Sequence, residues 1–191
     1  MKYHFKLLLS AGVLATSLGI QGAHAAKTSM TIALQLEPPH LDPTSAAAGA
    51  IDSVLYSNVF EGLTRFASDG AVIPGLAKSW EISEDGTEYI FHLNSAVTFH
   101  DGSTMDANDV KFSLDRARAE DSTNAQKALF SGIKNVEVLA SDKVKVTLAS
   151  PNGSFLFNMA WGDAVIVAPE TIDDIKTCLL YTSDAADEVL G

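Results

Sequence analysis

Histidine and acidic side chains are the groups of this chain that could carry out acid–base or metal chemistry. His92 lies within an alternating segment and His100 stands at a turn, so neither has another histidine or acid at metal-ligand spacing. His100 is followed by Asp101, but an Asp-Gly pair is typical of a turn. The chain has no G-x-S-x-G, H-E-x-x-H, P-loop or dinucleotide-binding glycine motif. We therefore expect that the protein is not an enzyme and that it has no catalytic residue, no metal and no cofactor.

Trp161-Gly162-Asp163 is the one place where an aromatic ring and an acid stand beside a glycine at the junction of two expected elements. This composition suits the wall of a small-molecule site, which makes Trp161 and Asp163 candidate ligand-binding residues. Burial of Trp161 in a hydrophobic core is the alternative.

The charge balance restricts the partners that the chain can have. It contains 13 basic and 24 acidic residues, for a net charge of −11, and no run of lysine or arginine. Such an acidic surface argues against binding to nucleic acid or to an anionic membrane.

The first 25 residues have the composition of a cleavable signal peptide. Lys2 and Lys6 form a basic head, residues 7–20 are apolar, and Ala23-His24-Ala25 is a small-x-small cleavage site. An uncleaved anchor is the alternative. We expect a mature chain that begins at Ala26 and lies in the periplasm, with no lipid attached because no cysteine stands at the cleavage site.

The other end has an unusual composition. Residues 178–188, CLLYTSDAADE, resemble the translation of a sequencing adapter, so we interpret 178–191 as an artefactual tail. A natural acidic tail is the alternative. The single cysteine, Cys178, lies in this tail, so the remaining chain has no thiol to form a disulfide.

Two β-hairpins are the clearest predicted elements. In the first, Trp80 and Ile82 alternate with polar residues before Asp85-Gly86, and residues 89–93 alternate after it. In the second, residues 133–139 and 143–149 flank a Ser-Asp turn, and the alternation predicts a hairpin with one buried face and one solvent-exposed face.

Other elements follow from periodicity and turn residues. The expected strands are 29–36, 63–66, 97–99 and 164–168. The expected helices are 46–60 ended by Gly62, a helix capped by Asp106 and Asp109, a helical turn over 125–130, a short helix over 155–161 capped by Ser154, and one beginning at Pro169.

The region of the first hairpin also resembles a known family. The segments PGLAKSW, SEDGTEYIFHL and VTFHDG, followed by DANDVKFSLDRA, are similar to the first lobe of family 5 extracellular solute-binding proteins, the peptide/nickel-binding family of ABC importers. The resemblance implies an α/β fold of the type II periplasmic-binding-protein kind. Of that fold we expect residues 26–177 to form part of the first lobe only, a mixed sheet and β-hairpins with flanking helices.

The resemblance also implies a function and partners. Two lobes would close over a small solute, in most cases a peptide, and the loaded monomer would deliver it to an ABC permease in the inner membrane. In relatives, the turn after the first strand lies at the cleft, and its backbone and an acidic residue touch the ligand. By position Glu37 matches that acidic residue, and Pro38 and His40 of the same turn are further candidate ligand-binding residues. Glu37 as a solvated carboxylate and His40 as an ordinary loop residue are the alternatives.

A different class of protein is the alternative function: a secreted hydrolase whose catalytic half is missing. The downstream reading frame would then contain a nucleophile or a metal motif rather than a second α/β lobe.

Overall fold

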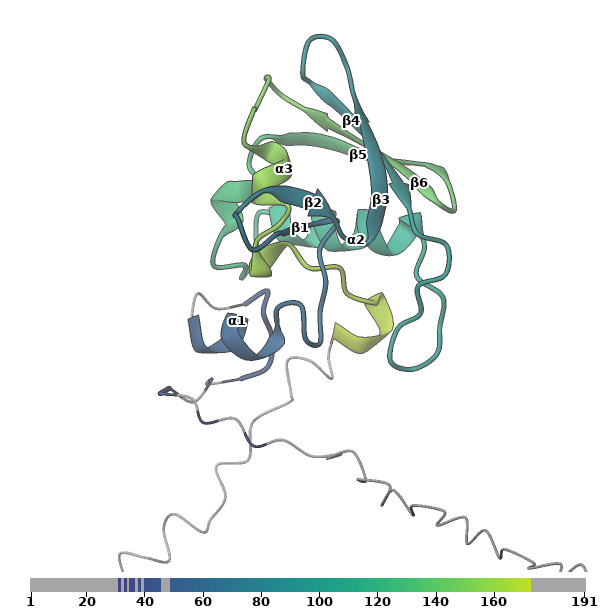
Figure 1. The fold of residues 1–191 in the computed structure, drawn as a ribbon. Helices are drawn as coiled ribbons and strands as arrows, with labels where there is room; N and C mark the ends of the chain where they lie inside the picture. Colours follow the sequence, from purple (N-terminus) through teal and green to yellow (C-terminus); the bar gives the residue numbers. More distant parts are fainter. Residues whose placement is uncertain are drawn as a thin grey trace, which may run out of the picture. The chain divides into compact units, whose positions relative to one another are not determined.

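A computed structural model describes residues 31, 33, 35–36, 38, 40–45 and 49–172 (Figure 1). The chain divides into a unit of residues 1–33 and a unit of residues 34–191, and all the described helices and strands belong to the second. The predicted signal peptide, Glu37 and the predicted tail lie outside the described residues.

Antiparallel strands form two sheets in this second unit (Figure 1). The larger sheet has the order β3-β4-β6-β5, and every pairing within it is antiparallel. The smaller sheet pairs β1 with β2. The strands are β1 (Thr64–Phe66), β2 (Val72–Pro74), β3 (Ala77–Ile82), β4 (Glu88–Leu93), β5 (Ile133–Ala140) and β6 (Lys143–Leu148).

Both predicted hairpins are confirmed. Trp80 pairs with Phe91 and Ile82 with Tyr89 across β3 and β4. The β5–β6 hairpin places Val136 opposite Val146. On β6 the buried and partly exposed residues alternate without interruption, as its sequence pattern predicts.

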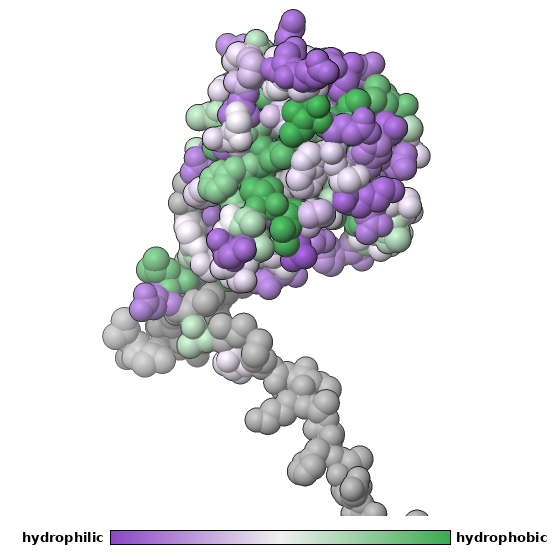
Figure 2. All heavy atoms as spheres, turned by 45° about the horizontal axis from the view of Figure 1, so that its top comes forward, coloured by the Kyte–Doolittle hydropathy of each residue, from purple (hydrophilic) through white to green (hydrophobic). Residues whose placement is uncertain are grey.

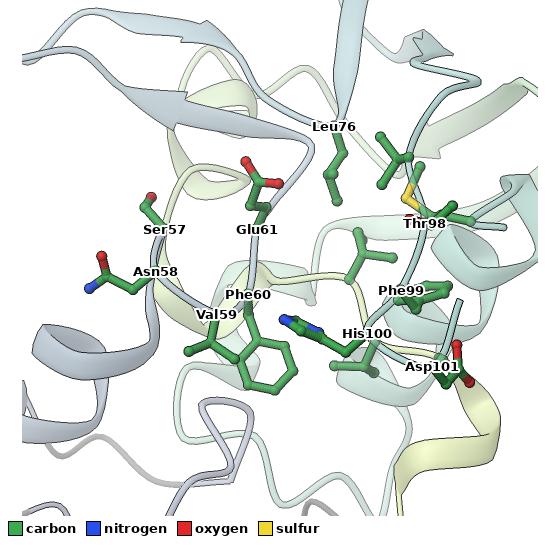
Figure 3. Close-up of a pocket in the computed structure, with 15 residues that line it drawn as sticks. Ser57, Asn58, Val59, Phe60, Glu61, Leu76, Thr98, Phe99, His100 and Asp101 are labelled. Atoms are coloured by element: carbon green, nitrogen blue, oxygen red, sulfur yellow. The ribbon is translucent and has the colours of Figure 1, made fainter. Parts of the chain in front are cut away.

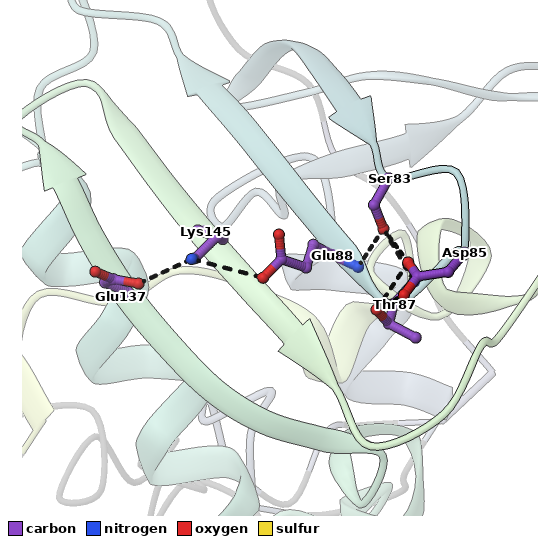
Figure 4. Close-up of polar contacts among 6 residues, drawn as sticks. All are labelled: Ser83, Asp85, Thr87, Glu88, Glu137 and Lys145. Atoms are coloured by element: carbon purple, nitrogen blue, oxygen red, sulfur yellow. Dashed lines mark hydrogen bonds and ion pairs between the residues drawn. The ribbon is translucent and has the colours of Figure 1, made fainter.

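Side-chain hydrogen bonds close the turn between β3 and β4 (Figure 4). The Ser83 hydroxyl donates to Asp85 over 2.6 Å and accepts from the Glu88 amide over 2.9 Å, while the Thr87 amide donates to Asp85 over 3.1 Å. The bond from Ser83, followed by those from Thr87, lowers the pKa of Asp85. Gly86 takes the left-handed backbone conformation, with φ of +69°, that this turn requires.

An ion-pair row stabilises the polar face of the larger sheet (Figure 4). The Lys145 ammonium on β6 lies 3.1 Å from Glu137 on β5 and 3.6 Å from Glu88 on β4. Opposite charges on three neighbouring strands favour the observed register.

The opposite face of the sheet is covered by α2 (Ala107–Arg118). This helix begins with the predicted capping box, since the Asn108 amide donates to Asp106 over 2.6 Å and the Asp106 amide donates to Asp109 over 2.7 Å. Val110 and Leu114 on its buried face belong to the same core as Phe91 on β4. The core lies between the helix and the sheet.

The remaining helices are short. They are α1 (Gly49–Leu55), α3 (Phe155–Asn158) and three 3-10 turns, η1 (Lys127–Phe130), η2 (Gly162–Ala164) and η3 (Pro169–Thr171). The helical turn within 125–130 and the start at Pro169 are therefore confirmed. Of the helices in the described part of the chain, none is long and apolar enough to cross a membrane.

Two helix predictions are wrong in their ends. The helix expected over 46–60 stops at Leu55, whose carbonyl accepts hydrogen bonds from the amides of Asn58, Val59 and Phe60, and Ser57 has φ of +59°. The helix expected over 155–161 begins at Phe155 as predicted but ends at Asn158. Ser154 is its N-cap residue but makes no capping hydrogen bond with its side chain; instead the Asn152 side chain accepts a hydrogen bond from the Ser154 amide over 3.0 Å. The turn of the backbone after Leu55 ends the helix, although the apolar residues that predicted a longer helix continue at helical spacing.

Two predicted strands are also wrong: 97–99 contributes only a bridge from Thr98 to Thr104, and 164–168 only a bridge from Val165 to Gly62. Half of the strand expected over 29–36 lies outside the described residues, and its described residues 31, 33, 35 and 36 are assigned to no strand. An alternating or apolar segment becomes a strand only when a partner runs beside it, and these segments have no partner ladder among the described residues.

Candidate ligand-binding site

The Trp161-Gly162-Asp163 segment forms the start of η2 and carries its tryptophan at the surface. Trp161 is 40% exposed, so its predicted alternative role as a core residue is wrong. Its ring meets Phe157 edge-on, with ring centroids 6.2 Å apart, and Phe157 packs on Phe66 at 4.9 Å. Figure 2 shows apolar side chains lying open on one face of the molecule among polar ones. The exposed rings of Trp161 and Phe157 offer a flat apolar contact to a ligand.

Asp163 lies in the opposite environment. Its side chain is 4% exposed, and its Oδ1 atom accepts no hydrogen bond. Its backbone carbonyl accepts a bond from the Asn124 amide nitrogen over 2.9 Å. Burial, and after it the charge of Asp52, raises the pKa of Asp163 to about 6.

Asp52 comes from α1 and lies against the same turn. A Cβ atom on Gly162 would overlap the Asp52 carboxylate, so the absence of a side chain at Gly162 is what allows the approach. Burial also raises the pKa of Asp52. The Tyr56 hydroxyl, one helical turn further on, donates to the Ala160 carbonyl over 2.6 Å and ties α1 to this segment.

The other predicted site segment lies next to the end of α2. Pro38 is buried, and the His40 Nδ1 atom accepts a hydrogen bond from the Asp42 amide over 3.2 Å. Asp42 in turn accepts from the Thr44 hydroxyl over 2.6 Å, and its carboxylate lies 3.7 Å from the Arg116 guanidinium. His40 therefore serves to shape the turn that follows it.

A hollow of about 350 Å³ lies beside the end of α2. Thr44 and Arg116 line one part of it, joined by a hydrogen bond of 2.6 Å, and Asn124 lines another. Asn124 also donates a hydrogen bond to the backbone carbonyl of Asp163. None of the four described candidate residues, Pro38, His40, Trp161 and Asp163, lines this hollow.

Sequence reasoning missed Asp52, Arg116 and Asn124. Asp52 stands on an apolar helix, and Arg116 stands on the polar face of α2, where an ordinary surface charge is expected. Asn124 belongs to the polar segment after α2, where no local pattern marks a binding residue.

A larger hollow of about 550 Å³ lies elsewhere, between residues 57–61, 97–101 and 166–168 (Figure 3). Phe60 and His100 project into it from different segments, and Leu76 contributes to its apolar lining. None of the sequence-predicted site residues lines this hollow.

Comparison with known proteins identifies the family. The profile of bacterial extracellular solute-binding proteins, family 5 (middle part), matches residues 71–182, which includes the first residues of the predicted tail. The glutathione-binding protein GsiB of Pectobacterium atrosepticum is 34% identical over 165 residues, which are 86% of this chain and 32% of that protein. The dipeptide-binding protein of Escherichia coli is 27% identical over 184 residues, 87% of this chain and 34% of that protein.

Solved structures agree on the fold. The binding protein AgaA of A. tumefaciens R10, in complex with agropinic acid, is matched with a TM-score of 0.69 at 30% identity over 75% of this chain and 29% of that one. Haemophilus influenzae OppA, in complex with a peptide, is matched with a TM-score of 0.68 over 78% of this chain and 32% of that one, and its 19% identity supports the fold alone. The expected fold class, a partial α/β lobe of a periplasmic binding protein, is confirmed.

The chain spans about a third of the length of the curated relatives it matches. The matched profile covers more than half of the chain, and the expected resemblance is confirmed on the segments that suggested it. The chain belongs to the family 5 bacterial extracellular solute-binding proteins.

Proposed function

We propose that this chain is part of the periplasmic substrate-binding component of an ABC importer for peptides or similar small solutes. The observation that carries the proposal is membership of a solute-binding family, together with relatives whose names state that they bind glutathione and dipeptides. The proposed protein is exported by a cleavable signal peptide, acts as a monomer and performs no covalent chemistry.

The proposed ligand contacts on this lobe are Glu37, Pro38, His40, Trp161 and Asp163. The exposed ring of Trp161 supports this assignment, because a surface aromatic beside a buried carboxylate combines an apolar wall with a polar anchor. The support for His40 as a ligand contact is weaker than that for Trp161, because its ring nitrogen already accepts a hydrogen bond from the Asp42 amide.

The proposed mechanism is closure of two lobes over the solute. Peptide ends are charged, and burying them requires polar partners from both sides of a cleft. A closed, loaded form then differs in shape from the open form, which gives the permease a means to recognise loading.

The test uses the full-length protein that contains residues 26–177. Its thermal unfolding is followed with dipeptides, tripeptides and glutathione in turn. A ligand at 100 times its Kd adds about 2.7 kcal/mol to the free energy of unfolding, which raises Tm by several degrees. If Tm stays the same with every peptide and related solute, the proposal is contradicted. If mass spectrometry detects the release of cleaved peptide, a secreted hydrolase is supported instead.

A further inference from the structure

We propose that Arg116 on α2 positions the turn that carries the proposed ligand contacts Pro38 and His40. This inference rests on the proposed function and adds to it a positioning residue, which acts on solute binding only through other side chains. The contacts run from Arg116 through Thr44 and Asp42 to His40.

Hydrogen bonds between alternate residues hold the turn at residues 40–45 together. The Asp42 amide donates to the His40 Nδ1 atom over 3.2 Å. The Thr44 amide and hydroxyl both donate to the Asp42 Oδ1 atom, over 2.8 and 2.6 Å. Pro43 stands between these two residues, and proline fixes its own φ, so the turn has few ways to absorb a shift locally. A displacement of Asp42 is therefore passed on to His40.

Arg116 connects this turn to a helix whose position is fixed by packing. Its Nη1 atom donates to the Thr44 hydroxyl oxygen over 2.6 Å, and its Nη2 atom lies 3.7 Å from the Asp42 carboxylate. Leu114 of the same helix is buried in the core beneath the larger sheet. The turn itself belongs to no helix or strand. The contact thus ties a segment without regular structure to one that the core holds in place.

The buried charge of Asp42 makes this connection necessary. Asp42 is 2% exposed, and its Oδ2 atom accepts no hydrogen bond. A carboxylate taken out of water needs a positive partner to keep its charge. In the described part of the chain, Arg116 is the only cation within ion-pair distance of Asp42. Without Arg116, we expect the turn to open until the carboxylate reaches water, which displaces His40.

Amide hydrogen exchange in the chain itself, followed by NMR, tests the positioning. The Asp42 and Thr44 amides should exchange about tenfold faster or more in Arg116→Gln than in the wild type. Arg118→Gln is the matched control, because Arg118 lies on the same helix but pairs with Asp115 over 2.8 Å, and it should leave both amides unchanged. Unchanged exchange in a folded Arg116→Gln protein, or equal acceleration in Arg118→Gln, overturns the inference.

A double variant separates the charge argument from general damage. Asp42→Asn combined with Arg116→Gln leaves no buried charge unpaired, so its Thr44 amide should exchange about threefold more slowly, or slower still, than in Arg116→Gln alone. If Arg116→Gln does not fold, the double variant should fold. A double variant that restores neither folding nor slow exchange overturns the inference.

Solute binding by the full-length protein tests the consequence, with glutathione and dialanine as probes. Arg116→Gln should weaken binding about tenfold or more in calorimetry, whereas Arg116→Lys, which keeps the positive charge, should weaken it by about threefold or less. Val110→Ala lowers Tm by removing buried volume from the core face of the same helix, and it should leave the affinity unchanged. Equal losses of affinity in Arg116→Gln and Val110→Ala would reduce the effect to general destabilisation and overturn the inference.

Failure of the inference is distinguishable from failure of the proposed function. If the full-length protein binds a probe equally well in the wild type and in Arg116→Gln, the function stands and the positioning role does not. If it binds neither probe nor any other peptide, the proposed function fails, and amide exchange at Asp42 and Thr44 still decides whether Arg116 positions the turn.

Discussion

At the scale of single residues, Asp163 makes the stability of the fold depend on pH. Its pKa is raised from 3.8 to about 6, so the folded state holds a proton that the unfolded state releases. The stabilising effect of that proton is complete below pH 4 and is lost as the pH rises through 6. The shift corresponds to about 2–3 kcal/mol at most.

Asp163→Asn should remove this dependence and raise the free energy of unfolding at pH 7.5, because the amide carries no charge and can fill the same space. Urea unfolding of the wild type, Asp163→Asn and the control Glu84→Gln at pH 4.5 and 7.5 measures the effect. A wild-type-like fall in stability between the two pH values in Asp163→Asn would contradict the assignment.

Trp161 should matter for binding and little for stability. Because its ring is 40% exposed, Trp161→Ala should lower the free energy of unfolding by about 1 kcal/mol or less, whereas Phe155→Ala, at a site 1% exposed, should cost about 3–5 kcal/mol. In the full-length protein, Trp161→Ala should weaken solute binding about tenfold in calorimetry. A large loss of unfolding free energy in Trp161→Ala, with unchanged affinity for the solute, would show that Trp161 has a structural role instead.

The sequence indicates Trp161 and Asp163 because aromatic, glycine and acid are adjacent in it. It cannot indicate Asp52, which lies more than a hundred positions away and meets Gly162 only after α1 has packed against η2. Pairings of this kind depend on the tertiary fold, so a single sequence carries no local trace of them.

At the scale of elements, the β3–β4 turn provides a test of local sequence control. Gly86 has φ of +69°, whereas Gly132 has no positive φ. At both positions an added Cβ atom would meet no neighbouring atom at less than ordinary van der Waals distance. Gly86→Ala should therefore cost about 1 kcal/mol from backbone strain, and Gly132→Ala should cost nothing measurable. Urea unfolding of both variants compares them, and equal losses would show that the turn is not a conformational requirement.

The same contrast explains which elements were predictable. Both hairpins and the capped start of α2 depend on residues a few positions apart, such as Asp106 and Asp109, and all three are confirmed. The strands expected at 97–99 and 164–168 require partners from distant parts of a chain. Their apolar pattern is real, but pattern alone does not supply the neighbouring strand.

At the scale of the whole molecule, the family was predictable from the sequence, whereas the ligand-binding residues remain a proposal. Segments such as SEDGTEYIFHL and VTFHDG combine turn residues with a fixed alternation, and this ordered set is specific to a fold in a way that a lone acid is not. The profile match and the solved structures confirm that level of the prediction.

The last prediction concerns what this chain can bind by itself. It spans about a third of the length of the curated relatives it matches, and the proposed mechanism places ligand contacts on two lobes. If each lobe contributes roughly half of a binding free energy of about −8 kcal/mol, which corresponds to a micromolar Kd, one lobe alone reaches only about a millimolar Kd. Calorimetry with a mixture of short peptides should therefore show no micromolar binding to the chain, and clear binding to the full-length protein. Micromolar binding to the chain alone would mean that this lobe holds a complete site, which would refute two-lobed capture of the solute.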